Sequence, residues 1–312
     1  MIHKKGIEMS FAWLFAIIAG AVIIFLAIYA TIQFVGSEKN VQNTEVGKQL
    51  GILLNPIETS LESAKFATIK LNSETRLYNI CSSAGTFGTQ GISAAVKSGV
   101  GEQWPNLPGT ESSFYNKYIF SEDIVQGTEY YIFVKPFEFP FKIADLSFIW
   151  PDSEEYCFVD TPREIESEVE DLQLKNVQIS SDIKNCTPSS KKVCFASSGC
   201  DIDVSLTSKS VKKQDKTIFY EGDLIYGAIF SSPDVYECQI KRLMKRVSEI
   251  ALLNVAKTQY LSVKGCNANL ESDLAKFASR AQAMNSSLDL RGLASDANNL
   301  EGRDSLLSCK MW

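Results

Sequence analysis

The sequence predicts an α+β protein: an N-terminal transmembrane helix, a mainly-β ectodomain braced by disulfides, and a C-terminal helical hairpin or three-helix layer. Three observations predict this class. A long uncharged apolar run lies near the N-terminus, β-branched and aromatic segments fill the middle, and apolar residues recur at helical spacing toward the C-terminus. We divide the chain into a short cytoplasmic segment with the transmembrane helix (1–36), a juxtamembrane helical stalk (37–65), a strand-rich ectodomain (66–233) and a C-terminal helical region (234–312).

The apolar run extends from Phe11 to Ile32 and contains no charged residue. As a helix it would span roughly 33 Å, enough for a hydrocarbon core of about 30 Å. A cleaved secretory signal has a shorter apolar core and ends at a small-residue site, which the sequence Gln33-Phe34-Val35 does not provide. The run therefore predicts a membrane helix that the protein retains.

The charges beside this run predict its orientation. Lys4 and Lys5 precede the run, whereas the segment that follows it has no basic excess. Positively charged flanks stay in the cytoplasm. We therefore expect a single-pass protein of the cell membrane, with its N-terminus inside and its ectodomain outside.

The letters "KKGIE" at residues 4–8, followed by the apolar run, resemble the archaeal class III signal of type IV pilin-like proteins. The resemblance implies that a dedicated peptidase cuts between Gly6 and Ile7, so that the helix survives and packs in a surface filament. The chain departs from many pilins, which have glutamate as the fifth mature residue; that position is Phe11, and the glutamate is Glu8. The remainder of the chain resembles no functionally known family.

All the cysteines follow the apolar run, and their number, eight, is even. This pattern is typical of disulfides formed in an oxidising compartment. Zinc binding is the alternative, but the sequence has no C-x-x-C, and its single histidine, His3, lies on the predicted cytoplasmic side. The disulfide candidates are Cys81, Cys157, Cys186, Cys194, Cys200, Cys238, Cys266 and Cys309.

One pairing follows from the expected helices. If the last two helices run antiparallel, Cys266 and Cys309 come to the same end, within reach of a disulfide. The alternative is a bond between Cys238 and Cys309, at the start of the preceding long helix. Of the two pairings, we expect the bond between Cys266 and Cys309.

Strand-like segments fill two regions. In 66–160 they are "FATIKL", "TRLYNICS", "SFYNKYIF", "EYYIFVKPFEFPF" and "ADLSFIW", and in 176–232 they include "KKVCFA", "CDIDVSL", "TIFYEG" and "LIYGAIF". Aromatic residues are densest between Phe114 and Tyr156, which we interpret as sheet core, with a binding platform as the alternative. Between the two regions, Thr161-Pro162-Arg163-Glu164 predicts a capping box and a short helix with a solvated acidic face.

Helical periodicity marks both ends of the ectodomain. An apolar stripe over 50–61 predicts a helix that either continues the anchor as a stalk or packs on the ectodomain. A second stripe predicts a long helix over 234–263, and two shorter helices follow, around 270–281 and 290–300. We interpret the basic cluster of the long helix as a solvated face paired with acids, with binding of an acidic partner or lipid headgroups as the alternative. The cluster is Lys241, Arg242, Lys245 and Arg246.

The composition limits the chemistry. The chain carries a formal charge of −6, which argues against a nucleic-acid partner. Residues 37–312 contain no histidine, P-loop, G-x-G-x-x-G or G-x-S-x-G, so the common nucleophilic and metal-dependent mechanisms lack their residues. A pair of carboxylates or a Ser-Lys dyad remains available, but no pair is singled out. We therefore predict no catalytic, cofactor-binding or metal-binding residue, no cofactor, and a protein that is not an enzyme.

These observations favour a membrane-anchored surface protein with a structural or recognition role. A pilin-like filament subunit processed after Gly6 is the alternative, and an extracytoplasmic carboxylate hydrolase is the third hypothesis. The expected partners are the membrane and either the protein itself or other surface proteins. Asn285 and, with less support, Asn185 lie in sequons for N-glycosylation.

Overall fold

The computed structural model describes residues 13, 15–31, 65–97, 104, 108–196, 198–266, 268–307 and 309–312. The implied cleavage site at Gly6 and Ile7 and nearly all of the predicted stalk (37–65) lie outside the described residues. The described chain is α+β, as predicted, with an N-terminal helix, two mixed six-stranded sheets and a set of C-terminal helices.

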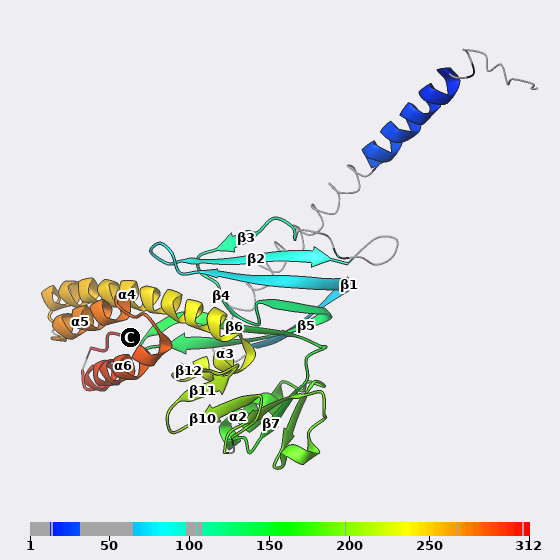
Figure 1. Ribbon diagram of the computed structural model, residues 1–312. Coiled ribbons are helices and arrows are strands. Elements are labelled where there is room, and N and C mark those ends of the chain that lie inside the picture. The colour runs from blue at the N-terminus through cyan, green and yellow to red at the C-terminus, as the bar shows by residue number, and fades with distance from the viewer. Residues whose placement is uncertain are drawn as a thin grey trace, which may run out of the picture.

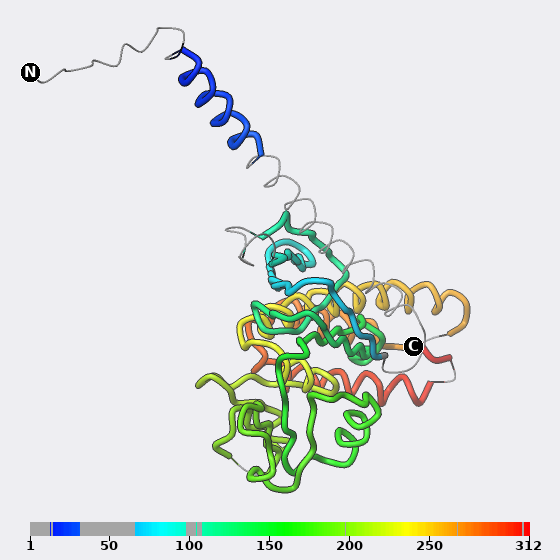
Figure 2. The backbone as a smooth tube through the Cα atoms, turned by 90° about the vertical axis from the view of Figure 1, so that its right-hand side faces the viewer, coloured from blue at the N-terminus to red at the C-terminus, as the bar shows by residue number. Residues whose placement is uncertain are grey.

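The N-terminal helix covers residues 15–31, and its apolar side chains are exposed in every direction. Figures 1 and 2 show it, in blue, standing away from the rest of the described chain. Its large exposed side chains are Phe15, Ile17, Ile18, Val22, Ile23, Ile24, Phe25, Leu26, Ile28 and Tyr29. In the part of the chain that the structure describes, no helix is both long and apolar enough to cross a membrane.

The first sheet has the order β3-β2-β1-β5-β6-β4, and its neighbours are antiparallel except for β4 and β6. The sheet curls enough to bring its edge strand β4 near β1: the Asn79 side chain of β1 donates a hydrogen bond to the Ile119 carbonyl of β4, 3.1 Å away. Apolar side chains including Ile92, Ile132 and Ile149 fill one face. The strands are β1 (Lys65–Ser82), β2 (Thr89–Val96), β3 (Ser112–Phe114), β4 (Tyr118–Phe120), β5 (Ile124–Glu138) and β6 (Lys142–Pro151).

Two details of this sheet differ from the sequence prediction. The segments "FATIKL" and "TRLYNICS" belong to one strand, β1, whose pairing with β5 shifts between Lys70 and Thr75. β2 was not predicted, because its sequence is rich in small residues instead of aromatic ones. An added Cβ at Gly91 would lie 2.1 Å from Oε1 of Glu111, so the Glu111 side chain would have to move to make room for it.

The second sheet has the order β12-β11-β10-β9-β7-β8, with parallel pairs from β8 to β10 and antiparallel pairs from β10 to β12. Its strands are β7 (Tyr156–Val159), β8 (Val177–Ser180), β9 (Lys191–Cys194), β10 (Ile202–Ser205), β11 (Ser210–Lys213) and β12 (Lys216–Phe219). Two helical segments, α2 (Arg163–Asp171) and the 3₁₀ turn η1 (Ile183–Asn185), lie between these strands in the chain.

The short helix α2 forms where it was predicted, but the capping box does not. Pro162 occupies the N-cap position, its carbonyl accepting from the Glu166 amide at 2.8 Å, and no side chain caps the helix. The helix begins one residue later than the capping-box pattern implies, so Thr161 is too far back to cap it.

The segment "LIYGAIF" is a helix, α3 (Leu224–Phe230), and the strand prediction is wrong there. All seven of its residues are buried, and it packs against β6, β11 and α4. A short apolar run that is buried on every side has no polar face to reveal its period, so its sequence does not distinguish a helix from a strand. Gly227 permits the packing, since an added Cβ would lie 2.6 Å from the Phe120 ring.

The C-terminal helices agree with the prediction to within a residue or two at most ends. They are α4 (Pro233–Val263), α5 (Glu271–Gln282) and α6 (Leu290–Ser305), with the 3₁₀ turn η2 (Ser287–Asp289) before α6. The Ser232 side chain caps α4 by accepting from the Val235 amide, and Gly265, with φ of +88°, follows its last turn. The three helices pack together, as Figure 1 shows.

One aromatic-rich core joins the two sheets to α3, α4, α5 and α6. At its centre Trp150 of β6 stacks on Phe230 of α3, with ring centroids 4.3 Å apart. Phe133 meets Tyr226 of α3 edge to face at 5.2 Å. The aromatic residues between Phe114 and Tyr156 are thus mainly core, as interpreted from the sequence.

The eight cysteines form four disulfides: Cys81–Cys238, Cys157–Cys186, Cys194–Cys200 and Cys266–Cys309. The predicted bond between Cys266 and Cys309 is present, and the alternative bond from Cys238 is absent because Cys238 is paired with Cys81. Four disulfides suit an oxidising, extracytoplasmic location.

Candidate functional site

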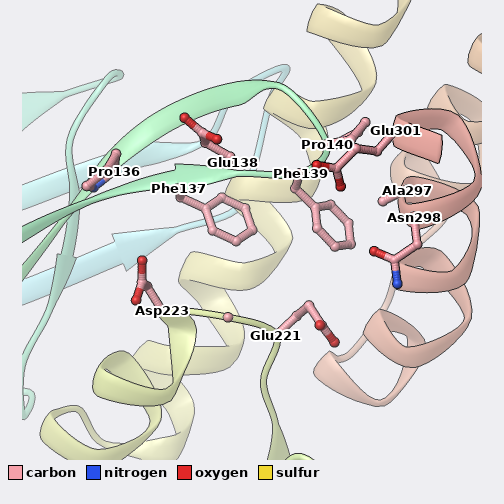
Figure 3. Close-up of a pocket in the computed structure, with 11 residues that line it drawn as sticks. Pro136, Phe137, Glu138, Phe139, Pro140, Glu221, Asp223, Ala297, Asn298 and Glu301 are labelled. Carbon is pink, nitrogen blue, oxygen red and sulfur yellow. The ribbon is translucent and has the colours of Figure 1, made fainter. Parts of the chain in front are cut away.

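A cleft of about 420 Å³ opens where three segments meet: the turn between β5 and β6, the loop before α3, and α6. Figure 3 shows the polar side chains around it. Four of them are carboxylates, and the fifth is an amide. They are Glu138, Glu221, Asp223, Glu301 and Asn298.

Each segment presents these side chains for a local reason. Glu138 ends β5 at a shift in its pairing with β6. Gly222, with φ of +53°, turns the chain between Glu221 and Asp223. Asn298 and Glu301 are three residues apart on the exposed face of α6, so they lie on the same side of the helix.

Two phenylalanines form the apolar part of the cleft wall, but their rings are not open to a ligand. The rings of Phe137 and Phe139 stack with centroids 5.7 Å apart, and Phe139 also contacts Phe277 of α5 at 5.9 Å. Both phenylalanines are buried, so their rings belong to the core. They shape the cleft without offering a stacking surface to a sugar.

Asp223 belongs to an ionic network beneath the cleft. The buried Lys135 ammonium lies 2.6 Å from Oδ1 of Asp223 and 2.7 Å from Oε1 of Glu168 on α2. The Tyr226 hydroxyl donates a third contact, to Glu168. One lysine ammonium thus contacts two carboxyl groups, so the formal charge of these three groups together is negative.

The environment raises the pKa of the Asp223 carboxyl above its usual value. Burial is the main cause, the bond from Lys135 opposes it, and the nearby charge of Glu168 adds to it. Burial and the bond to Glu168 also raise the pKa of the Tyr226 hydroxyl. Asp223 therefore differs from an ordinary surface acid.

The arrangement suits a cationic ligand or proton transfer between carboxyl groups. Lys209 pairs with Glu221, and Lys135 pairs with Asp223. Glu138 and Glu301 are exposed. Among the described residues, no three His, Cys, Asp or Glu side chains converge as a metal site.

The sequence did not single out these carboxylates. Its acidic helix, α2, was interpreted as a solvated face, yet Glu168 on that helix pairs with Lys135. The cleft joins residues far apart in the chain, and among many acids only one local signal was available: Asp223 immediately precedes the buried run of α3.

The basic cluster on α4 is not a solvated face paired with acids, because three of its four residues donate to main-chain carbonyls of the first sheet and its loops. Arg242, which is fully buried, donates to the carbonyls of Lys117 and Tyr115, at 2.8 and 3.2 Å. Lys245 donates to the carbonyls of Ser83 and Gly85, and Arg246 to that of Ile143. These three side chains reach main-chain oxygens because the first half of α4 lies against the first sheet.

The two sequons lie apart from the cleft residues in the chain. Asn185 and Asn285 are exposed. In the second sequon the Ser287 hydroxyl is buried and donates to Glu237 at 2.5 Å. The Asn285 side chain is therefore accessible to solvent, whereas Ser287 of the same sequon is buried and hydrogen-bonded in the folded protein.

Comparison of the chain with family models, curated proteins and solved structures finds no match in any of the three.

Proposed function

We propose that the protein is a single-pass, membrane-anchored surface protein whose extracytoplasmic body has a structural or recognition role. Its N-terminal helix would lie in the cell membrane, with Lys4 and Lys5 on the cytoplasmic side. Its partners would be the membrane and either further copies or other surface proteins. Catalysis is not part of this proposal.

The N-terminal helix carries the proposal. A helix that exposes large apolar side chains on all sides is unfavourable in water, so it needs lipid or protein around it. The uncharged run in the sequence extends beyond the described helix to Phe11 and Ile32. The four disulfides support an exterior location for the body.

Alkaline carbonate extraction of membranes tests the anchor. We expect full-length protein to remain in the pellet and to enter solution only with detergent. A variant with Ile23 and Phe25 changed to lysine should be released, because each charge at a helix centre opposes insertion by about 3 kcal/mol. Release of the unaltered protein by carbonate alone would refute anchoring.

A pilin-like filament subunit is the second candidate, favoured by the "KKGIE" pattern before the helix. In this alternative, the apolar helix would be covered by neighbouring subunits. Mass spectrometry of the mature protein should then find Ile7 at the N-terminus, and Gly6→Val should block the cut. Electron microscopy of the cell surface should show filaments; an intact Met1 in cells that contain the peptidase would exclude this candidate.

A carboxylate hydrolase is the third candidate, and the raised pKa of Asp223 beside other acids favours it. Assays of the full chain on a panel of chromogenic glycosides would test it. Activity would have to disappear in Asp223→Asn and persist in Asp160→Asn, whose carboxyl does not line the cleft. Activity equal in both variants would point to a contaminant.

A further inference from the structure

The second half of α4 has an exposed apolar face. Leu252, Leu253, Tyr260 and Val263 are 47, 68, 64 and 83% exposed, and Ala256 is exposed among them. Their spacing puts all five on one side of the helix, opposite the side that packs on the core. Figure 1 shows this half of α4 extending past the strands of the first sheet.

Opposite charges mark the two ends of this face. Glu249 stands four residues before Leu253, and Lys264 stands four residues after Tyr260, so both lie on the same side of α4 as the apolar residues. Both charged side chains are exposed. The face therefore has an acid at its start and a base at its end.

This pattern is complementary to itself when reversed. An antiparallel second copy that puts its Tyr260 opposite Leu253 also puts its Lys264 opposite Glu249, because the two pairs share one midpoint on the helix. Ala256, beside that midpoint, is small enough for the two helices to approach closely. Every contact then occurs twice, as a two-fold axis requires. A parallel copy would instead bring like charges together at both ends.

We propose that the outer face of α4, formed by Glu249, Leu252, Leu253, Ala256, Tyr260, Val263 and Lys264, binds the same face of a second copy in antiparallel orientation. In an antiparallel copy, the acid and the base at the two ends of the face exchange places, so each meets its opposite charge. This match favours a second copy over an unrelated partner. The proposal goes beyond anchoring, since it gives the body of the protein an interface of its own.

Charge reversal tests the orientation. The mass of the full-length protein in detergent micelles, measured by sedimentation over a range of concentrations, should correspond to a dimer. Glu249→Lys and Lys264→Glu should each raise the dissociation constant about tenfold, because each change turns two attractive contacts into repulsive ones. The double variant restores opposite charges and should return the constant to within about threefold of its original value.

A matched pair of variants tests the surface. Leu253→Asp should yield monomers, whereas Leu288→Asp, at a side chain 56% exposed on η2, should leave the dimer intact. A photoreactive residue in place of Tyr260 should cross-link to the peptide that contains Leu253 of the other molecule. Monomeric unaltered protein, a Leu253→Asp variant that stays dimeric, or a double charge variant no stronger than the single ones would overturn the proposal. Cross-linking of the photoreactive residue at position 260 to a peptide of its own molecule would also overturn the proposal.

Discussion

Arg242 shows how one buried side chain can join α4 to the first sheet. Its guanidinium lies over the Tyr118 ring at 4.8 Å and donates to Gln239 as well as to the two loop carbonyls. Burial lowers its pKa to about 10, still far above neutral pH. Carbonyl and amide dipoles and the Tyr118 ring thus stabilise the charged side chain, and no acidic side chain among the described residues forms an ion pair with it.

We predict that Arg242→Ala lowers the free energy of unfolding by about 2–4 kcal/mol, because it removes the hydrogen bonds to the Lys117 and Tyr115 carbonyls and opens a cavity. Chemical denaturation would measure the loss. Lys241→Ala, at a half-buried neighbour in the same basic cluster, should stay within about 0.5 kcal/mol of the unaltered protein. Equal effects of the two substitutions would contradict this role for Arg242.

Lys213 gives a pH-dependent prediction. Its buried ammonium donates to the carbonyls of Ile229 and Ser231 at the end of α3, and burial lowers its pKa from 10.5 to about 8. Between these pH values the unfolded chain binds more protons than the folded one, so stability rises with pH. The full rise from this group would be about 3 kcal/mol.

The measurement compares the unaltered protein with Lys213→Met between pH 7.5 and about 9, below the usual tyrosine pKa of about 10. The unaltered protein should gain stability across this window, and the variant should gain less. Identical slopes would show that Lys213 does not titrate in this range. The negative charges of Glu122 and Glu154 raise the pKa of Lys213 and the positive charge of Lys191 lowers it, but burial has the largest effect.

At the scale of elements, glycine in α3 has a packing role that overrides helix propensity. Alanine normally stabilises a helix interior by about 1 kcal/mol relative to glycine. Gly227→Ala should instead destabilise the protein by about 1–3 kcal/mol, because its methyl group would meet the Phe120 ring. Gly302→Ala in α6, where an added Cβ has open space, should stabilise it, and thermal melting of the two variants would show the opposite signs.

The elements also show what the sequence could predict. α4, α5 and α6 each have one buried and one exposed face, so apolar spacing revealed them and placed Cys266 near Cys309. α3 has no exposed face, so its sequence lacks the polar positions that reveal helical spacing. β2 is built from small residues, so it lacks the β-branched and aromatic residues that mark a strand. The basic cluster was misinterpreted because its partners are carbonyls, which no sequence pattern identifies.

The candidate cleft was beyond sequence analysis for a different reason. Glu138, Asp223 and Glu301 line it from three separate segments of the chain. Composition could show that acids were plentiful, but only the folded chain shows which ones share a cleft and that Lys135 lies beneath them.

At the scale of the whole molecule, the disulfides differ in how much of the chain they close. Cys81–Cys238 links β1 to α4 across 157 residues, Cys266–Cys309 spans 43, and Cys194–Cys200 spans 6. The loop-entropy model assigns these loops stabilisations of about 5, 4 and 2 kcal/mol. Replacing each pair by serines should therefore destabilise the protein in that order.

Denaturant titration of the three double-serine variants would measure this ranking. Loss of Cys81–Cys238 should cost most, since it also frees the helix that carries Arg242 from β1. A larger loss for Cys194–Cys200 than for Cys81–Cys238 would show that chain closure does not dominate the contribution of these bonds.

The central claim, an exterior body held by an N-terminal membrane helix, is tested most directly by adding protease to intact cells that make the full-length protein. Mass spectrometry of the fragments that remain with the cells would then show which part was protected. We predict that the segment before about residue 40 survives in the membrane and that the body is cleaved or shed once reductant has opened its disulfides. Protection of the whole chain until the cells are lysed would contradict both the orientation and the exterior location.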